Sequence, residues 1–140
     1  NWISNNKISN EYMEIMSRNL LSLTLDVSPE TVKSQYDAFL RFVTPDLRSY
    51  IVENLKKSSE NIINNDIAQS FYIDTIKVVP MSQTTYVVGN LATYINNQQV
   101  TNIHQLYKIK YATDDMTVKI KEYRLLDPQK DAAELKGIGL

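Results

Sequence analysis

The chain has no cysteine, three glycines and one histidine in 140 residues, and each scarcity excludes a kind of chemistry. Without cysteine there can be no disulfide and no thiol nucleophile, although this absence fits the periplasm and the cytosol alike. Two of the glycines, Gly137 and Gly139, lie at the C-terminal end, so Gly89 alone cannot form a phosphate-binding loop. His104 needs a partner from elsewhere in the fold before it can act as acid, base or ligand.

Long hydrophobic runs and an excess of one charge are also missing. No stretch approaches the roughly 20 apolar residues that cross a bilayer, and Ser22 and Thr24 interrupt the most apolar segment, Leu20–Leu25. Fifteen basic and sixteen acidic residues are interspersed, for a net charge of −1. This balance argues against direct nucleic-acid binding. Because the chain opens on Asn1 without methionine, we expect a fragment of a longer protein.

The N-terminal half has the apolar spacing of amphipathic helices. Ser9 or Asn10 is a suitable N-cap for the first helix, while Ser28 and Thr44 each precede a proline, as at many helix starts. We expect the first helix to bury a stripe formed by Ile8, Tyr12, Ile15, Met16, Leu20 and Leu23. The three predicted helices span about residues 9–25, 29–43 and 45–66.

The C-terminal half is rich in β-branched and aromatic residues. Four strands are predicted, at about residues 70–79, 84–95, 100–112 and 116–126. The short polar connections between them allow hairpins but no parallel crossovers, so we expect one antiparallel meander. The alternation changes phase near Asp74, which predicts a bulge, and Gly89 could mark a bend. Helices on one face of this sheet give a two-layer α+β domain over residues 1–128, with 129–140 a loose tail or short helix.

No set of side chains forms a catalytic, cofactor or metal site in the sequence. We interpret His104 as structural or exposed, and Asp114-Asp115 as a hairpin turn rather than a cation site. Serines are numerous, but none lies in a nucleophile elbow. The nine tyrosines have two readings: they pack the sheet, or some of them line a groove or interface.

Spaced apolar, proline and glycine positions from Trp2 to Pro128 resemble the periplasmic domain of the TraE family of conjugative, type IV secretion proteins. The segments that carry this resemblance are Tyr12-Met13, Leu20–Leu25, Val27–Val32, Phe39-Leu40, Val43–Pro45, Phe71 with Ile73, Val87–Leu91 and Tyr107–Tyr111. The pattern covers nearly the whole chain and contains no catalytic signature.

The resemblance implies a specific architecture and role. Such proteins are related to the VirB assembly factors, whose periplasmic domain has the cone-shaped nuclear-transport-factor fold, with three helices on a curved four-stranded antiparallel sheet. They are single-pass proteins of the bacterial inner membrane. The resemblance therefore implies a non-enzymatic scaffold that contacts itself and other components of the secretion channel, with a transmembrane helix outside this fragment and no cofactor.

One departure concerns the mode of self-association. The related VirB domains carry an Asn-Pro-x-Gly turn before their last strand, whereas this chain has Thr113-Asp114-Asp115-Met116 there. The dimer mode that depends on that turn therefore does not transfer. By analogy, the candidate interface residues are Tyr12, Ile15 and Met16 of the first helix and Tyr123 and Arg124 of the last strand.

Two other functions remain open. The same cone fold can house a ligand-binding or enzymatic pocket, which would need a buried carboxylate, and Asp74 and Glu122 are the carboxylates on predicted strands. Alternatively, a peptide could add a strand to the Phe71–Val79 or the Met116–Leu126 edge of the sheet.

Overall fold

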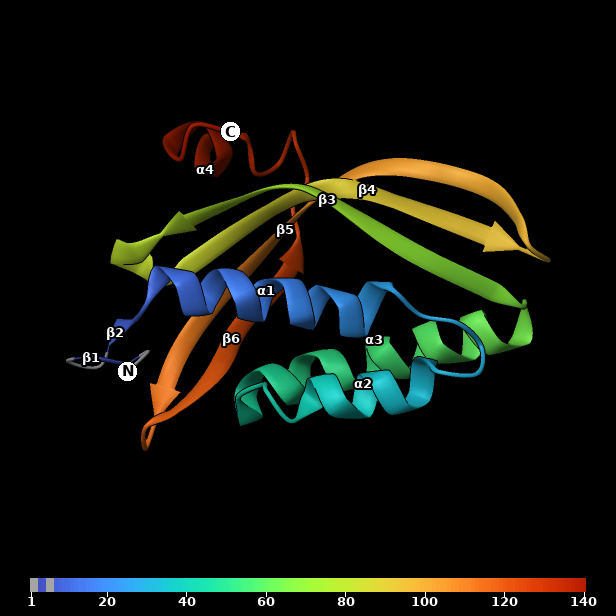
Figure 1. The fold of residues 1–140 in the computed structure, drawn as a ribbon, viewed down its shortest axis with the longest axis horizontal. Helices are drawn as coiled ribbons and strands as arrows, with labels where there is room; N and C mark the ends of the chain where they lie inside the picture. The colour runs from blue at the N-terminus through green and yellow to red at the C-terminus, as the bar shows by residue number, and fades with distance from the viewer. Residues whose placement is uncertain (1–2, 5–6) are drawn as a thin grey trace.

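The computed structural model describes residues 3–4 and 7–140, in which three helices pack on a curved sheet (Figure 1). Trp2, where the family resemblance begins, lies outside the described residues. The main elements are α1 (Asn10–Leu25), α2 (Val32–Leu40), α3 (Pro45–Asn64), β3 (Ile67–Val79), β4 (Thr84–Ile95), β5 (Gln98–Asp114) and β6 (Thr117–Leu125). The shorter ones are β1 (Ile3–Ser4), β2 (Lys7–Ile8), the 3-10 turn η1 (Pro80–Ser82) and α4 (Ala132–Gly137). The predicted α+β class is confirmed.

The sheet has the strand order β3-β4-β5-β6, with every neighbouring pair antiparallel, so the predicted meander is confirmed. The register shifts between Ile73 and Thr75, which confirms the bulge expected near Asp74. Two further shifts were not expected. One leaves Val100 of β5 without a partner in β4, and the other leaves Lys121 of β6 without a partner in β5.

Two of the three helix starts follow the sequence. Ser9 caps α1 by accepting a bond from the N–H of Tyr12, and Thr44 caps α3 by accepting from the N–H of Leu47. The prediction that the second helix begins at Pro29 and ends at residue 43 is wrong. The segment after Ser28 first makes a turn, in which the carbonyl of Ser28 accepts from the N–H groups of Thr31 and Val32, and α2 runs only from Val32 to Leu40.

Two strands, β3 and β5, are longer than predicted, whereas β6 is one residue shorter at each end. β3 begins at Ile67 instead of residue 70, and β5 extends over Gln98–Asp114 instead of 100–112. The asparagine-rich connection that suggested a longer loop is a tight turn, with positive φ at Asn96 and Asn97. The β4–β5 hairpin therefore extends beyond β6, which pairs only with residues 107–114 of β5.

The buried stripe of α1 differs from the expected one. Its fully covered positions are Met13, Ser17, Leu20, Leu21, Thr24 and Leu25. Ile15 was assigned to this stripe and is 50% exposed, so that part of the prediction is wrong. A purely apolar criterion misses Ser17 and Thr24, because hydroxyl groups can be buried when they find hydrogen-bond partners.

The face of β6 reverses at the extra residue Lys121. Simple alternation along the last strand predicts that Tyr123 lies on the face opposite Val118 and Ile120. In the structure Tyr111 pairs with Ile120 and Ile109 with Tyr123, so one more residue intervenes on β6 than on β5. Tyr123 therefore packs on the helix side, edge-on to the ring of Phe39 at 5.0 Å, and the predicted face is wrong.

Gly89 of β4 lies where β3 approaches closely. A Cβ atom at this position would lie 2.4 Å from the carbonyl oxygen of Tyr72 and 2.7 Å from the ring of Phe71. Gly89→Ala should lower the free energy of unfolding by about 1–3 kcal/mol, because the backbone of β3 must move. Urea denaturation measures this difference.

The matched control is Gly137→Ala in α4, where an added Cβ meets nothing within 4 Å. Its effect should stay within about 0.5 kcal/mol. Equal stability of the Gly89→Ala variant and the parent protein would contradict the close approach of β3 and β4.

Candidate interaction surfaces

Buried hydroxyl groups fix α1 to the sheet at two points. The Oγ of Ser17 lies 2.6 Å from Oγ1 of Thr85 and 2.8 Å from Oη of Tyr111. Seven residues further along α1, Oγ1 of Thr24 lies 2.5 Å from Oη of Tyr123. Burial raises the pKa of Tyr111 and of Tyr123, so both phenols stay protonated. These contacts fix which face of α1 is turned away from the sheet.

That exposed face of α1 carries three of the five predicted interface residues. Tyr12, Ile15 and Met16 are spaced as neighbours on a helix surface. Ile15 is 50% exposed, while Tyr12 and Met16 are half-buried against the core. We call these three residues the α1 patch. It remains a predicted interface.

The other two predicted interface residues are engaged within the domain. Tyr123 packs among Phe39, Tyr107 and the hydroxyl of Thr24. Arg124 forms ion pairs with three acidic residues. Replacing Tyr123 by alanine would therefore damage the core first, and it is a poor probe of association.

An ionic cluster holds the C-terminal segment on the outer face of the sheet. The Nζ of Lys108 lies 2.7 Å from Oε2 of Glu134, and the hydroxyl of Tyr86 donates to the same oxygen at 2.5 Å. Arg124 pairs with Asp131 at 3.2 Å and with Glu134 at 3.3 Å. Of the two expectations for residues 129–140, the structure shows the short helix, α4, and it is anchored.

The charges of this cluster lower the pKa of its carboxyl groups. Burial by itself would raise the pKa of Glu134, but the hydrogen bonds from Lys108 and Tyr86 and the positive charges of Lys108 and Arg124 together lower it. The pKa of Asp131 is lowered first by the backbone N–H of Asp127 and then by Arg124. The ionised forms therefore stabilise the docked α4.

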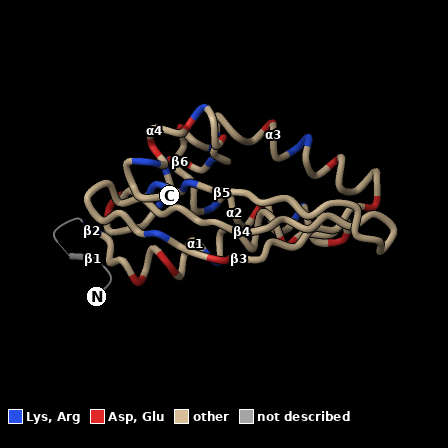
Figure 2. The backbone as a smooth tube through the Cα atoms, turned by 90° about the horizontal axis from the view of Figure 1, so that it is seen from above, with Lys and Arg blue, Asp and Glu red and all other residues tan. Residues whose placement is uncertain are grey.

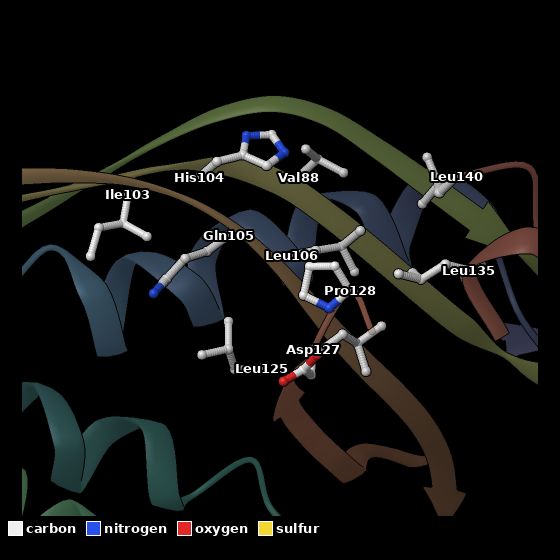
Figure 3. A pocket seen from close by; sticks show the side chains of 11 residues that line it. Val88, Ile103, His104, Gln105, Leu106, Leu125, Asp127, Pro128, Leu135 and Leu140 are labelled. Atoms are coloured by element: carbon white, nitrogen blue, oxygen red, sulfur yellow. The ribbon is translucent and has the colours of Figure 1, made fainter. Parts of the chain in front are cut away.

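A cavity of about 690 Å³ lies where β6 ends and the C-terminal segment begins (Figure 3). The residues that line it are mostly apolar: Val88, Ile103, His104, Gln105, Leu106, Leu125, Leu126, Asp127, Pro128, Leu135 and Leu140. Asp127 is the one carboxylate among them, and it accepts bonds from the N–H groups of Gln129 and Lys130. Its carboxylate thus fixes the turn into the C-terminal segment.

The carboxylates considered from the sequence do not line this cavity. Asp74 is exposed at the bulge of β3, and Glu122 is paired with Lys108 and Arg124. Asp115 lies with Met116 in the hairpin turn before β6, as expected, whereas Asp114 is the last residue of β5 and pairs with Thr117. Across residues 3–4 and 7–140, no group of three or more metal-ligating side chains comes together.

The sheet edges proposed from the sequence for an added strand are partly occupied. On β3, the carbonyl of Val27 accepts from the N–H of Gln69, and the carboxylate of Asp26 accepts from the N–H of Phe71 at 2.7 Å. On β6, Ile120 exchanges backbone bonds with the segment before α3, donating to Phe42 and accepting from Thr44. These contacts hinder strand addition at both edges.

Sequence comparison places the chain among proteins of one family. The family described as TraE protein matches residues 1–124. Protein TraE of Salmonella typhi is 32% identical over 108 residues, which are 77% of this chain and 58% of that protein. Protein TraE of Escherichia coli (strain K12) is 25% identical over 97 residues, 69% of this chain and 52% of that protein. The chain spans about half the length of the curated relatives it matches.

Solved structures share the fold at low sequence identity. The soluble domain of TrwG, of the type IV secretion machinery of Bartonella grahamii, superposes with a TM-score of 0.70 at 10% identity, over 84% of this chain and 93% of that one. VirB8 of Agrobacterium tumefaciens gives 0.62 at 11% identity, over 83% and 91%. A TraE protein in complex with 2-chloroisonicotinic acid gives 0.65 at 10% identity, over 86% and 98%. The nuclear-transport-factor-like fold implied by the resemblance is confirmed.

None of the helices in the described part of the chain is long and apolar enough to cross a membrane.

The hydroxyl contacts of α1 predict the effect of Ser17→Ala. This change leaves Tyr111 and Thr85 without their shared partner in a buried place, so the free energy of unfolding should fall by about 1–3 kcal/mol. The control is Ser22→Ala, on the exposed side of the same helix, with an effect within about 0.5 kcal/mol. Equal stabilities of the two variants would contradict the anchoring role of Ser17.

The ionic cluster predicts that α4 leaves the sheet in acid. Because the folded pKa values of Asp131 and Glu134 are lowered, their stabilisation is complete above the unfolded values near pH 4 and is lost as the pH falls through the lower folded values. NMR signals of α4 should therefore move to unfolded positions in acid. Glu134→Gln should weaken the docking already at pH 7, whereas Lys136→Gln, at the exposed end of α4, should not. An unchanged α4 spectrum in Glu134→Gln would contradict this account.

Proposed function

Because the chain belongs to the TraE family, we propose that it is a non-enzymatic scaffold of a type IV secretion channel for conjugative DNA transfer. The match over residues 1–124 is the observation that carries this proposal. The fold shared with TrwG and VirB8 supports it. Scaffolding here means contact with other channel components and with further copies of the same chain.

We place this domain in the periplasm, on a protein anchored in the bacterial inner membrane by a single helix. The relatives are about twice as long as the part matched here, which leaves room for such an anchor. Basic and acidic residues are interspersed along the backbone (Figure 2). This distribution favours protein partners over direct contact with the transferred DNA.

The α1 patch supplies a suitable contact surface. Apolar side chains that are exposed next to half-buried ones lose water readily when a partner covers them. The hydroxyl anchors of Ser17 and Thr24 hold α1 rigidly, so a partner would meet a preformed surface. Arg124, engaged by Glu122, Asp131 and Glu134, contributes to this role by holding the C-terminal segment.

A second candidate function is the binding of a small apolar ligand, which the cavity at the end of β6 favours. Its volume of about 690 Å³ lies within the range of small-molecule sites. Small pyridine carboxylic acids occur in complexes of solved TraE proteins, at about 10% identity to this chain. Catalysis at this cavity would have to use Asp127 or His104.

The scaffold proposal predicts that surface contacts, and not carboxylates, determine DNA transfer. In cells that carry the complete conjugative system, Ile15→Asp in the full-length protein should reduce transfer by about tenfold or more, the effect of losing one well-buried apolar contact. Asp74→Asn, Glu122→Gln and Asp127→Asn should leave transfer within about threefold of the parent, provided that the proteins accumulate equally.

Val52→Asp is the matched control, since Val52 is 40% exposed on α3, outside the α1 patch. A loss of transfer caused by a cavity carboxylate in a folded protein would favour the ligand-binding or enzymatic function. Normal transfer in Ile15→Asp would remove the α1 patch from the proposal.

A further inference from the structure

One half of β5 has no strand on its outer side. β4 pairs with residues 98–110 of β5, whereas β6 pairs only with residues 107–114. On the side where β6 would continue, residues 98–105 therefore have no strand partner among the described residues. We call this segment the open edge. In Figure 1 the β4–β5 hairpin extends past the end of β6. An unpaired edge of this length is a template for another strand.

The direction of the backbone groups on the open edge follows from one hydrogen bond. The carbonyl of Leu106 accepts from the N–H of Leu126 at 2.8 Å, so it points to the side of β6. The N–H and C=O of one strand residue share a side, and the sides alternate along the strand. Between Thr101 and Leu106 the register with β4 is regular. Asn102 and His104 therefore direct both of their backbone groups outward.

The other edges of this sheet carry backbone contacts and charges that block strand addition; the open edge has neither, and its one irregularity is the extra residue Val100. β3 is covered at Gln69 and Phe71, bulged at Asp74 and charged at Lys77. β6 is bonded at Ile120 and is flanked by charged side chains. The open edge contains no lysine, no other charged residue and no proline. It also exposes two β-branched apolar side chains, Val100 at 51% and Ile103 at 50%.

We infer that the open edge is where two copies of this chain pair, β5 against β5, to form one continuous sheet. This inference rests on the proposed scaffold function and assigns a surface to its self-contact. The copies run antiparallel about a two-fold axis at Asn102, with Thr101 of one copy facing Ile103 of the other. Asn102 then exchanges backbone hydrogen bonds with its counterpart.

A second copy of the open edge fits beside the first in length and in charge. It is bounded by the hairpin turn at residues 96–97 at one end and by Leu126, the residue after β6, at the other. A second antiparallel copy centred on Asn102 faces residues 99–105 and ends next to Leu126. Because neither copy has a charge in the segment, no like charges meet, whereas a charged peptide would find no complement.

The contact should be weak and reversible. An eight-residue strand pair buries less surface than the roughly 1,200–2,000 Å² of a standard interface. We therefore expect a dissociation constant of about 0.1–1 mM for the separate domain. Anchoring of the full-length protein to one membrane would raise the effective concentration of the domains and favour the pair.

Sedimentation equilibrium over a concentration series up to about 1 mM tests the pairing. The mass of the domain should rise reversibly toward that of a dimer. Ile103→Lys puts a charge next to the axis on both copies and should weaken the dimer at least tenfold. Val52→Lys is the matched control, because Val52 is 40% exposed but lies on α3; it should leave the dimer unchanged.

Disulfide trapping gives independent geometric evidence. Since the chain has no cysteine, Asn102→Cys introduces the only thiol. Paired residues of antiparallel strands have Cα atoms about 4.5–5.5 Å apart, within the range that a disulfide can bridge. Oxidation should therefore link Asn102→Cys into dimers much faster than Asn19→Cys, whose thiol would lie exposed on α1.

Two results would overturn the inference. A domain that stays monomeric up to 1 mM lacks the pairing. A dimer that is lost in Ile15→Lys and kept in Ile103→Lys associates through the α1 patch, so the open edge is not its self-contact while the scaffold function stands. Failure of the scaffold function itself would appear in the DNA-transfer assay, which does not involve Ile103.

Discussion

β5 extends beyond β6, and this difference in length determines which part of the sheet is covered. β4 pairs with residues 98–110 of the seventeen-residue β5, while nine-residue β6 pairs only with the half that ends at Asp114. The covered half carries Tyr107, Ile109 and Tyr111, which face the helices and are buried. The uncovered half carries only exposed or half-exposed residues. β5 therefore contributes buried side chains to the core at its C-terminal end and exposed side chains at its N-terminal end.

Hydrogen bonds between hydroxyl groups convert this sheet into a rigid support for α1. Ser17 and Thr24 lie on the buried side of the helix and reach Tyr111 of β5 and Tyr123 of β6. Apolar packing alone would tolerate a rotation of α1 more easily, because it has no direction. The directional contacts fix the α1 patch relative to the sheet, as an assembly surface requires.

The arrangement of the main helices and strands could be predicted from the sequence, whereas the surfaces that they form could not. Caps such as Ser9 and Thr44 and the short polar connections are local signals, so helices and meander could be predicted. The extra residue Lys121 has no local signal, and it reverses the side of Tyr123. The ionic cluster of Lys108, Arg124 and Glu134 joins residues far apart in the chain. The open edge depends on where β6 stops relative to β5, which is a tertiary property.

The open edge could have been suspected from one feature of the sequence. Residues 98–105 have strand-forming residues and lack the charges that protect other edges, but composition cannot distinguish an inner strand from an edge. Knowing the register was necessary. The same holds for the cavity, whose walls come from β4, β5, the end of β6 and the C-terminal segment (Figure 3).

Hydrogen exchange of individual backbone amides, measured by NMR at about 20 µM and about 1 mM protein, tests whether two copies pair through β5. The amides of Asn102 and His104 should exchange freely in the dilute sample and be protected in the concentrated one. The amides of Ile103 and Gln105, which already bond to β4, should be protected in both. Unchanged exchange of Asn102 and His104 at the two concentrations would contradict pairing through β5.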